Sequence, residues 1–304
     1  MARITVLDGG TGRELKRIGA PFRQPEWSAL ALIEAPQFVT RVHEAYVAAG
    51  ADVITTNSYA IVPFHIGAER FQSEGRALAK LAGRLARAVA DRAGRPVAVA
   101  GCLPPTCGSY LAERFDAAVA RPILQTLVEA LRPHVDYWLG ETLSLIAEAE
   151  LIRETVGPAI STDAKPLWLS FALEDETGPA APVRLRSGEG VADAVAAAVR
   201  LDAAAILFNC SRPEVMGAAV TEANTALSRL ASGAATVQIG VYANAFQPQD
   251  AGYQSNESLS GIRAEVTPAA YLDWARDWVA RGATIIGGCC GIGPEHITAL
   301  RAGL

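Results

Sequence analysis

The feature that most constrains the fold is a regular alternation of short β-branched runs with longer helical runs. Eight runs are predicted as strands: Ile4–Asp8, Asp52–Asn57, Val97–Cys102, Tyr137–Thr142, Leu167–Ala172, Ala204–Cys210, Val237–Asn244 and Thr284–Cys289. Runs rich in Ala, Leu, Arg and Glu predict helices between them, most clearly over Ala35–Ala49, Phe71–Ala93, Ile123–Leu131, Ser144–Val156, Gly190–Leu201, Glu214–Leu230 and Pro268–Arg281. This alternation is typical of a parallel sheet covered by helices, because parallel strands need a crossover connection.

Eight such units in 304 residues favour a closed barrel over an open sheet. A doubly wound sheet usually has fewer strands and a reversal of strand order. We therefore predict an α/β fold, a (β/α)8 TIM barrel formed as one domain by residues 1–304. Three stretches rich in Pro and Gly are compatible with loops on one face of this barrel: Leu103–Ser109, Glu174–Gly188 and Phe246–Ser260.

Charge and composition exclude several classes of partner. The net charge of -5 and the absence of a basic stripe argue against binding to nucleic acid or to an anionic membrane. No apolar run is long enough to cross a bilayer, and Met1–Asp8 leads into a strand without the pattern of a signal peptide, so we predict a cytoplasmic protein. Five cysteines indicate reduced thiols rather than a disulfide framework. The apolar helices are compatible with a homo-oligomer.

Polar side chains gather at the ends of the predicted strands, where a barrel of this kind builds its active site. They are Asp8, Thr56, Asn57, Glu141, Thr142, Asn209, Tyr242 and Asn244. The carboxylates of Asp8 and Glu141 are candidates to receive a substrate ammonium through charge-assisted hydrogen bonds. The alternatives are a turn residue for Asp8 and a helix cap for Glu141.

Cysteines end three of the predicted strands, and two of these, the ones that end in Cys210 and Cys289, supply the candidate metal ligands. Cys289 and Cys290 are neighbours, and a regular strand would point their side chains to opposite faces. The glycines around them allow the backbone to leave the strand path and bring both sulfurs together. With Cys210 they form a trio of thiolates that suits zinc, with a fourth coordination position open. A packed core thiol for Cys210 and a strained vicinal disulfide for the pair remain alternatives.

Other candidate motifs carry weaker signals. Cys102 is interpreted as a core thiol and Cys107 as a loop residue, although their spacing is close to that of metal ligands and makes them the main rivals of the trio. No histidine ends a predicted strand, which disfavours a hydrolytic zinc site. The glycine-rich segment from Asp8 to Gly12 lacks the dinucleotide spacing and the phosphate-loop lysine, and its backbone amides are candidates to hold a carboxylate instead.

Seven segments together resemble the homocysteine S-methyltransferase family, in order and over essentially the whole chain. They are Leu7-Asp-Gly-Gly-Thr-Gly-Arg-Glu-Leu15, Trp27-Ser-Ala, Ala49-Gly-Ala-Asp-Val-Ile-Thr-Thr-Asn-Ser-Tyr59, Glu141-Thr142, Asn209-Cys210, Val241-Tyr-Ala-Asn244 and Ile286-Gly-Gly-Cys-Cys-Gly291. The most specific part is the cysteine after the sixth strand followed by the Gly-Gly-Cys-Cys motif. One departure is Gly291-Ile292-Gly293, where the family motif usually continues with Arg and a hydroxyl residue.

The resemblance implies a zinc-dependent barrel that methylates the thiol of homocysteine to give methionine. It implies these roles for residues of this chain: Cys210, Cys289 and Cys290 as zinc ligands; Asp8 and Glu141 on the homocysteine ammonium; Gly9 and Thr56 on its carboxylate; and Asn209 and Asn244 among the substrate-binding residues.

The methyl donor is predicted from what the chain lacks relative to other branches of the family. It has no cobalamin- or folate-binding extension, and Thr142 stands where the betaine-using branch has an aromatic residue. We therefore predict a free sulfonium donor, S-methylmethionine or S-adenosylmethionine. Another donor, a selenol acceptor, and a non-catalytic zinc- or thiol-sensing barrel are the alternatives; the carboxylates of Asp8 and Glu141 favour the enzyme.

Overall fold

The strand and helix alternation is present in the computed structural model of the protein, which describes residues 3–158, 164–175, 182–230, 237–247 and 260–304. The strands are β1 (Thr5–Val6), β2 (Val53–Thr55), β3 (Ala98–Leu103), β4 (Tyr137–Leu143), β5 (Leu167–Phe171), β6 (Ala205–Asn209), β7 (Gln238–Tyr242) and β8 (Ile285–Ile286). The helices are α1 (Thr11–Arg17), α2 (Ala29–Glu34), α3 (Pro36–Ala48), α4 (Pro63–Ile66), α5 (Ala68–Asp91), α6 (Ala117–Leu131), α7 (Ile146–Val156), α8 (Val191–Arg200), α9 (Pro213–Leu230), α10 (Pro268–Ala280) and α11 (Pro294–Gly303). Short 3-10 turns span Ala112–Arg114 and Arg132–His134.

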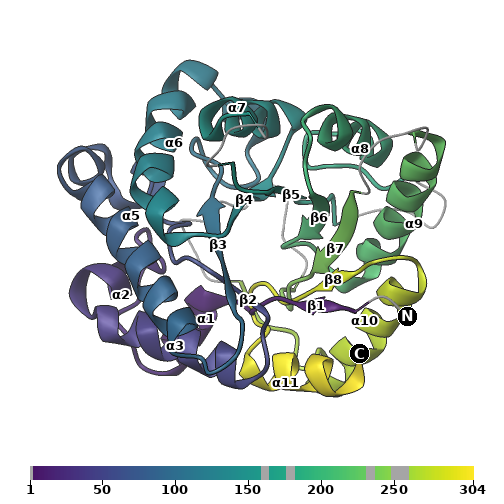
Figure 1. Ribbon diagram of the computed structural model, residues 1–304, viewed down its shortest axis with the longest axis horizontal. Coiled ribbons are helices and arrows are strands. Elements are labelled where there is room, and N and C mark those ends of the chain that lie inside the picture. The colour runs from purple at the N-terminus through teal and green to yellow at the C-terminus, as the bar shows by residue number, and fades with distance from the viewer. Residues whose placement is uncertain (1–2, 159–163, 176–181, 231–236, 248–259) are drawn as a thin grey trace.

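The strands form one parallel sheet that closes on itself. The order is β1-β8-β7-β6-β5-β4-β3-β2, and each neighbouring pair is parallel. A parallel bridge between Leu7 and Val53 joins the two ends of this order, supported by a 2.7 Å bond from the Asp52 N–H to the Val6 carbonyl. The strands therefore lie in a ring with the helices around it, and the first and last strands are side by side (Figure 1). The predicted (β/α)8 barrel is confirmed.

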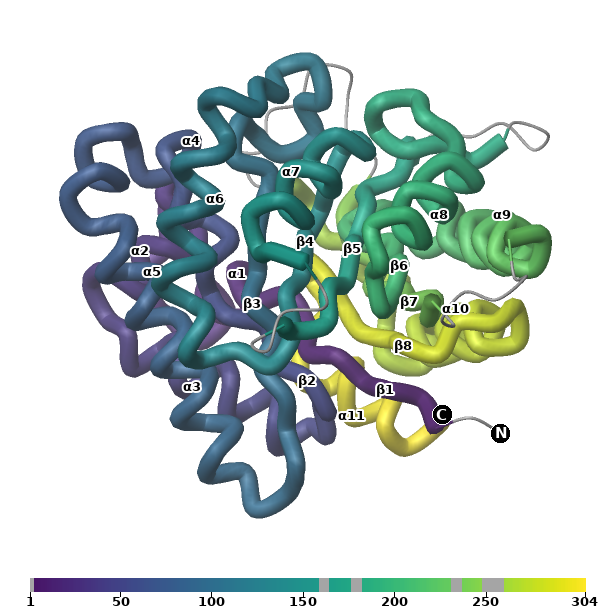
Figure 2. Tube along the Cα trace, turned by 45° about the horizontal axis from the view of Figure 1, so that its top comes forward, coloured from purple at the N-terminus to yellow at the C-terminus, as the bar shows by residue number. Residues whose placement is uncertain are grey.

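Two apolar layers hold the barrel together. The larger lies between strands and helices, and the helices pack outside the strands in both views (Figure 2). The smaller consists almost entirely of alternating strand residues, such as Ala205 and Leu207, as expected for the barrel interior. There the rings of Tyr137 and Trp168 stack with their centroids 4.5 Å apart. Among the described residues, no helix is both long enough and apolar enough to cross a membrane.

Element boundaries differ from the prediction in instructive ways. β8 ends at Ile286, three residues before the predicted end, because the glycines that follow leave the sheet. Helix α6 begins at Ala117, earlier than predicted, with the Asp116 carboxylate accepting the Ala118 N–H at 2.8 Å. The helix continues through Pro122, which lacks an N–H donor, and so includes the residues before the predicted start at Ile123. The short helices α1, α2 and α4 and the final helix α11 were not predicted.

Candidate metal centre

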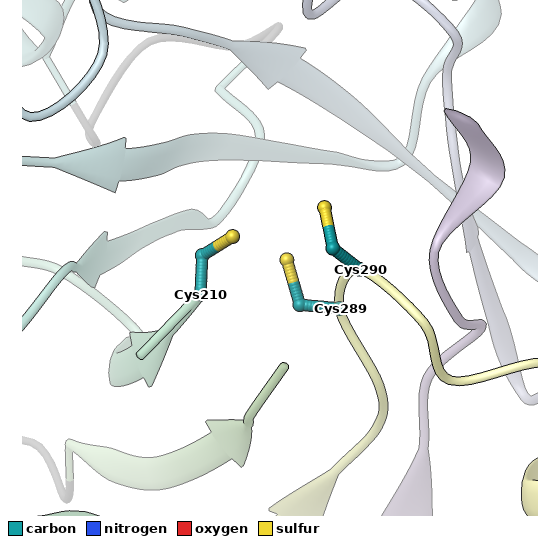
Figure 3. Close-up of side chains that lie close together, drawn as sticks. All are labelled: Cys210, Cys289 and Cys290. Atoms are coloured by element: carbon teal, nitrogen blue, oxygen red, sulfur yellow. The ribbon is translucent and has the colours of Figure 1, made fainter. Parts of the chain in front are cut away.

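Three cysteine sulfurs converge at one end of the barrel. Cys210 directly follows β6, and Cys289 and Cys290 lie in the loop after β8. Their Sγ atoms all lie within 4.8 Å of one another. Figure 3 shows Cys210 approaching from one side and the other two from the opposite side, with the sulfurs turned toward a common space. The structure thus brings together the three residues that the sequence analysis selected.

The backbone around the trio departs from regular strand geometry, as the glycine pattern predicted. Cys210 has a φ of +50°, in the left-handed region that non-glycine residues rarely occupy. Gly288 donates its N–H to the Asp8 carbonyl at 2.9 Å, and Cys289 donates to the Ala243 carbonyl at 2.9 Å. A Cβ at Gly288 would overlap the side chain of Ile292. Only glycine therefore fits at this point, where the loop folds back on itself.

Hydrogen bonds within and around the trio favour a thiolate at Cys210. In the protein without metal, hydrogen bonds from the thiols of Cys289 and Cys290 lower the pKa of Cys210. The same hydrogen bonds to Cys210 raise the pKa of Cys289 and of Cys290. Two groups from outside the trio also stabilise the Cys210 thiolate: the hydroxyl of Tyr110, whose Oη lies 3.0 Å from Sγ, and the side-chain amide of Asn244.

The trio opens into a cavity of about 990 Å³ at the carboxyl ends of the strands. The predicted residues that line it are Asp8, Gly9, Thr56, Asn57, Glu141, Thr142, Cys210, Tyr242, Asn244, Cys289 and Cys290. Described parts of all three predicted loops also contribute, through Ser109, Glu174, Asp175, Arg186 and Phe246. All of the predicted polar strand-end residues except Asn209 therefore share one space, as expected for this fold.

The Asp8 carboxylate is held in the cavity wall by β2. Its Oδ2 accepts the Thr55 N–H at 2.7 Å, and its Oδ1 accepts the Thr55 hydroxyl at 3.2 Å. Burial, with a contribution from the charge of Glu141, raises the pKa of Asp8 to about 8. A carboxyl in this state gains its charge readily when a cation arrives, because the cation offsets the desolvation.

Glu141 is the second carboxyl of the cavity, and its partner is unexpected. The Cys102 thiol donates to Glu141 Oε2 at 3.0 Å. Burial raises the pKa of Glu141 to about 7, while the Cys102 hydrogen bond opposes this shift. Cys102 is fully buried, as predicted for a core thiol, but it also contacts a cavity carboxyl. Cys107 lies in a loop near Thr106 and Asp116, as predicted, and does not line the cavity.

Two of the residues predicted to hold a carboxylate lie at the cavity but have close internal partners. Gly9 packs so tightly that a Cβ would overlap the Ile292 carbonyl and the Tyr46 ring. The Thr56 hydroxyl accepts the Cys102 N–H at 3.0 Å. It lies 2.9 Å from the Ser58 hydroxyl, which itself donates to the Cys102 carbonyl, so the hydrogen of Thr56 points to Ser58. The hydroxyl of Thr56 therefore has its donor engaged within the protein.

Asn209 and Asn244 have different positions. Asn209 is completely buried and does not line the cavity. Its Oδ1 accepts the Ser170 hydroxyl at 2.7 Å and the Thr142 N–H at 3.2 Å, and its amide donates to the Thr142 hydroxyl at 2.8 Å. These bonds hold Thr142 at a φ of +61° and connect three strand ends, a different position from the substrate contact predicted for Asn209. Asn244 lines the cavity and accepts the Phe246 N–H at 3.1 Å.

Several cavity residues were missed by the sequence analysis. Tyr59 and Tyr110 line the wall, and the Tyr59 hydroxyl lies 2.6 Å from that of Ser109. Arg186 and Asp175 form a 2.7 Å ion pair at the cavity. Asp175 and Arg186 lie in a loop predicted for this face, and Tyr59 ends one of the segments that resemble the family, whereas Tyr110 lies one residue beyond a predicted loop. The described histidines lie in helices or turns, as predicted, and His65 also lines the cavity.

Comparison with known proteins identifies the family. The family model described as homocysteine S-methyltransferase matches residues 5–304. The chain is 28% identical to homocysteine S-methyltransferase YbgG of Bacillus subtilis, over 98% of this chain and 94% of the relative, and 25% identical to the selenocysteine methyltransferase of Astragalus bisulcatus, over 97% and 90%. It is similar to the crystal structure of the metallated homocysteine methyltransferase MmuM from Escherichia coli, with a TM-score of 0.74, 26% identity and coverage of 98% and 96%. The chain belongs to the homocysteine S-methyltransferase family.

Proposed function

We propose that this protein is a homocysteine S-methyltransferase that moves a methyl group from a sulfonium donor to the thiol of homocysteine. The observation that carries the proposal is the shared cavity, in which the sulfurs of Cys210, Cys289 and Cys290 face the same space as the buried carboxyls of Asp8 and Glu141. A thiol amino acid needs both features, because one end carries a sulfur and the other an ammonium.

The chemistry of the donor set fits zinc. Tetrahedral zinc with Zn–S distances of about 2.3 Å separates its sulfur ligands by about 3.8 Å. The three Sγ atoms, all within 4.8 Å of one another, need only a small adjustment to reach that spacing. Cys210, Cys289 and Cys290 would hold the ion, which would supply a Lewis acid with a fourth position where a substrate thiol would lose its proton at neutral pH.

We propose that Asp8 and Glu141 bind the ammonium of homocysteine and set its orientation. Both are buried carboxyls whose pKa is raised by burial, so a bound cation would offset the cost of burying their charge. The substrate carboxylate then lies toward the Gly9 and Thr56 side of the wall. Since the donor of the Thr56 hydroxyl is engaged by Ser58, we propose a steric rather than a hydrogen-bonding role for that side chain.

The cavity also suits a sulfonium. Its lining includes the rings of Trp27, Tyr59 and Tyr110 and the carboxylate of Glu174, which attract a cation. The thiolate sulfur of homocysteine attacks the methyl carbon, the bond from that carbon to the donor sulfur breaks, and its electron pair stays on the donor as a neutral thioether leaves. The protein contributes in-line placement of two bound molecules, mostly a matter of orientation.

A selenol acceptor is a second candidate for the same site. The similarity to a selenocysteine methyltransferase at 25% identity supports it. A larger, softer selenium nucleophile would use the same metal position, so the two acceptors are separated by relative kcat/KM in one assay.

The test is a donor panel with purified, zinc-loaded protein. We expect about one zinc per chain and methionine from homocysteine with S-methylmethionine or S-adenosylmethionine. Cys289→Ala should lose most of the bound zinc and the activity, while Cys107→Ala, outside the cavity, should keep both. Zinc binding without methionine from any sulfonium, betaine or methylfolate donor would leave a metal-binding protein and refute the enzyme.

A further inference from the structure

A tyrosine outside the metal ligands makes direct contact with one of them. The Tyr110 hydroxyl donates to Cys210 Sγ at 3.0 Å. Tyr110 lies in the loop after β3 and Cys210 follows β6, so the contact joins two parts of the chain that are 100 residues apart. A hydrogen bond to a coordinating thiolate fixes the sulfur and withdraws part of its charge.

The backbone at Tyr110 is held in an unusual conformation that aims this hydroxyl. Tyr110 has a φ of +66°, which is an outlier for a bulky side chain. The preceding residue, Ser109, is buried and lies 2.6 Å from the Tyr59 hydroxyl, which anchors the loop. Strain of this kind persists only where surrounding contacts enforce it, and it clusters at functional sites.

A cation lies over the face of the same ring. The Arg186 guanidinium carbon is 5.0 Å from the centroid of Tyr110. Arg186 is fixed by a 2.7 Å ion pair with Asp175, and Asp175 accepts the Arg212 N–H at 2.9 Å. Arg212 is two residues after Cys210, so the network returns to the loop that carries the sulfur. A positive charge over the ring draws electron density from the phenol and makes its hydroxyl a stronger donor.

We infer that Tyr110 is a positioning residue of the metal centre, which tunes the Cys210 thiolate through its hydroxyl, and that Arg186 strengthens this hydrogen bond through the ring. This inference rests on the metal site proposed above. Loss of the hydroxyl leaves Cys210 Sγ with more charge and a less fixed position. The extra charge favours the metal–sulfur bond, but the loss of a fixed position should weaken metal binding overall, because partners that orient a ligand typically contribute 10- to 100-fold to metal affinity.

The test uses Tyr110→Phe in the full chain, loaded with Co²⁺ or Zn²⁺ and without substrate. We expect the sulfur-to-cobalt charge-transfer band to move to lower energy, and zinc affinity in competition with a chelator to fall about 10-fold or more. Arg186→Met keeps the hydroxyl and should move the band in the same direction by less. Tyr137→Phe is the matched control, since Tyr137 does not line the cavity and its ring stacks on Trp168 in the barrel interior, and it should leave the band and the affinity unchanged.

The outcomes separate this inference from the proposed function. Failure of the wild-type protein to bind Co²⁺ or Zn²⁺ would remove the metal site itself. Normal binding by the wild type, with the same band and affinity in Tyr110→Phe, would overturn the role of Tyr110 and leave the metal site standing. An equal change in Tyr137→Phe would also overturn it, because the effect would then follow the loss of any tyrosine hydroxyl rather than the contact with the sulfur. If Tyr110→Phe does not fold, an unshifted band in Arg186→Met overturns the role of the network.

Discussion

At the scale of single residues, the cavity depends on carboxyls that are costly to bury and on donors that reduce that cost. Glu141 has the Cys102 thiol against one oxygen at 3.0 Å, and Asp8 has the Thr55 N–H against one oxygen at 2.7 Å. Each donor favours the charged form against the desolvation that raises the pKa of the carboxyl. The carboxylates therefore stay available to a cation inside a largely buried wall.

The Cys102 thiol should contribute to substrate affinity without touching the substrate. In Cys102→Ala, Glu141 loses a donor and its pKa rises further, so KM for homocysteine should rise about three- to tenfold, as expected for one hydrogen bond of roughly 0.5–1.5 kcal/mol. The pH at which affinity is half-maximal should move upward. Cys102→Ser restores a donor and should remain near wild type, as should Cys107→Ala. Equal KM values for the Ala and Ser variants at position 102 would contradict this role; steady-state kinetics at saturating donor decide it.

At the scale of elements, the loop between β8 and α11 is fixed by the beginning of the chain. The Ile292 carbonyl accepts the Gly10 N–H at 3.0 Å and the Tyr46 hydroxyl at 3.2 Å. Its side chain is buried and packs against Gly288. The Gly291-Ile292-Gly293 segment, which departs from the usual family motif, thus anchors the cysteine loop to α3 and to the Gly9-Gly10 turn.

Replacement of Gly288 by alanine should displace this loop. The new Cβ would meet the Ile292 Cβ at 2.5 Å, and neither atom can rotate away. Overpacking of this kind costs about 1–3 kcal/mol, so we expect a lower melting temperature together with weaker zinc binding. Gly190→Ala is the matched control, because its Cβ would meet only the mobile end of Asp193, at 2.9 Å, and should change neither quantity much. Normal zinc affinity in Gly288→Ala would show that the loop tolerates the shift.

At the scale of the whole molecule, closure of the barrel assembles the site. The Asp52 carboxylate accepts the Val6 N–H at 3.0 Å and pairs with Arg301 and Arg3, so β1, β2 and α11 meet at one carboxylate. Gly10 packs against the Cys289 carbonyl, which a Cβ would approach to 2.5 Å. The first and last segments of the barrel therefore both contribute to the position of the metal ligands.

Global stability should depend on pH through His43 in α3. This side chain is completely buried, and neither ring nitrogen has a hydrogen-bond partner among the described residues. Burial lowers the pKa of His43 to about 4. The unfolded chain takes up the proton near pH 6.5, whereas the folded protein stays neutral until about pH 4, so stability is complete above pH 6.5 and falls as the pH falls through this window.

The expected loss from His43 is about 2 kcal/mol between pH 7 and pH 5. Urea unfolding of the metal-free protein measures it, with His43→Leu as the comparison. Buried carboxyls with a raised pKa, such as Glu148, give the opposite slope: their contribution is present at low pH and is lost as the pH rises through about 7. These carboxyls are present in both the wild type and His43→Leu, so the difference between the pH profiles of their free energies of unfolding reports the contribution of His43. Parallel pH profiles would refute the assignment.

The amino-acid sequence by itself determined the number and order of strands, the placement of polar and sulfur side chains at their ends, and the need for glycine near Cys289. These follow from local periodicity and backbone preference, which a linear chain displays directly. The boundaries were less accurate, as at Ile286 and Ala117, because packing and capping set them.

Only the tertiary structure decided which of these side chains meet. The contacts of Tyr110 with Cys210, of Cys102 with Glu141, and of Asn209 with Thr142 join residues 100, 39 and 67 positions apart. Such contacts depend on barrel closure, on strand register and on side-chain torsions, which have no periodic signature in the sequence. The tertiary structure therefore separated Asn209, which supports Thr142 through hydrogen bonds without lining the cavity, from the residues that face the cavity.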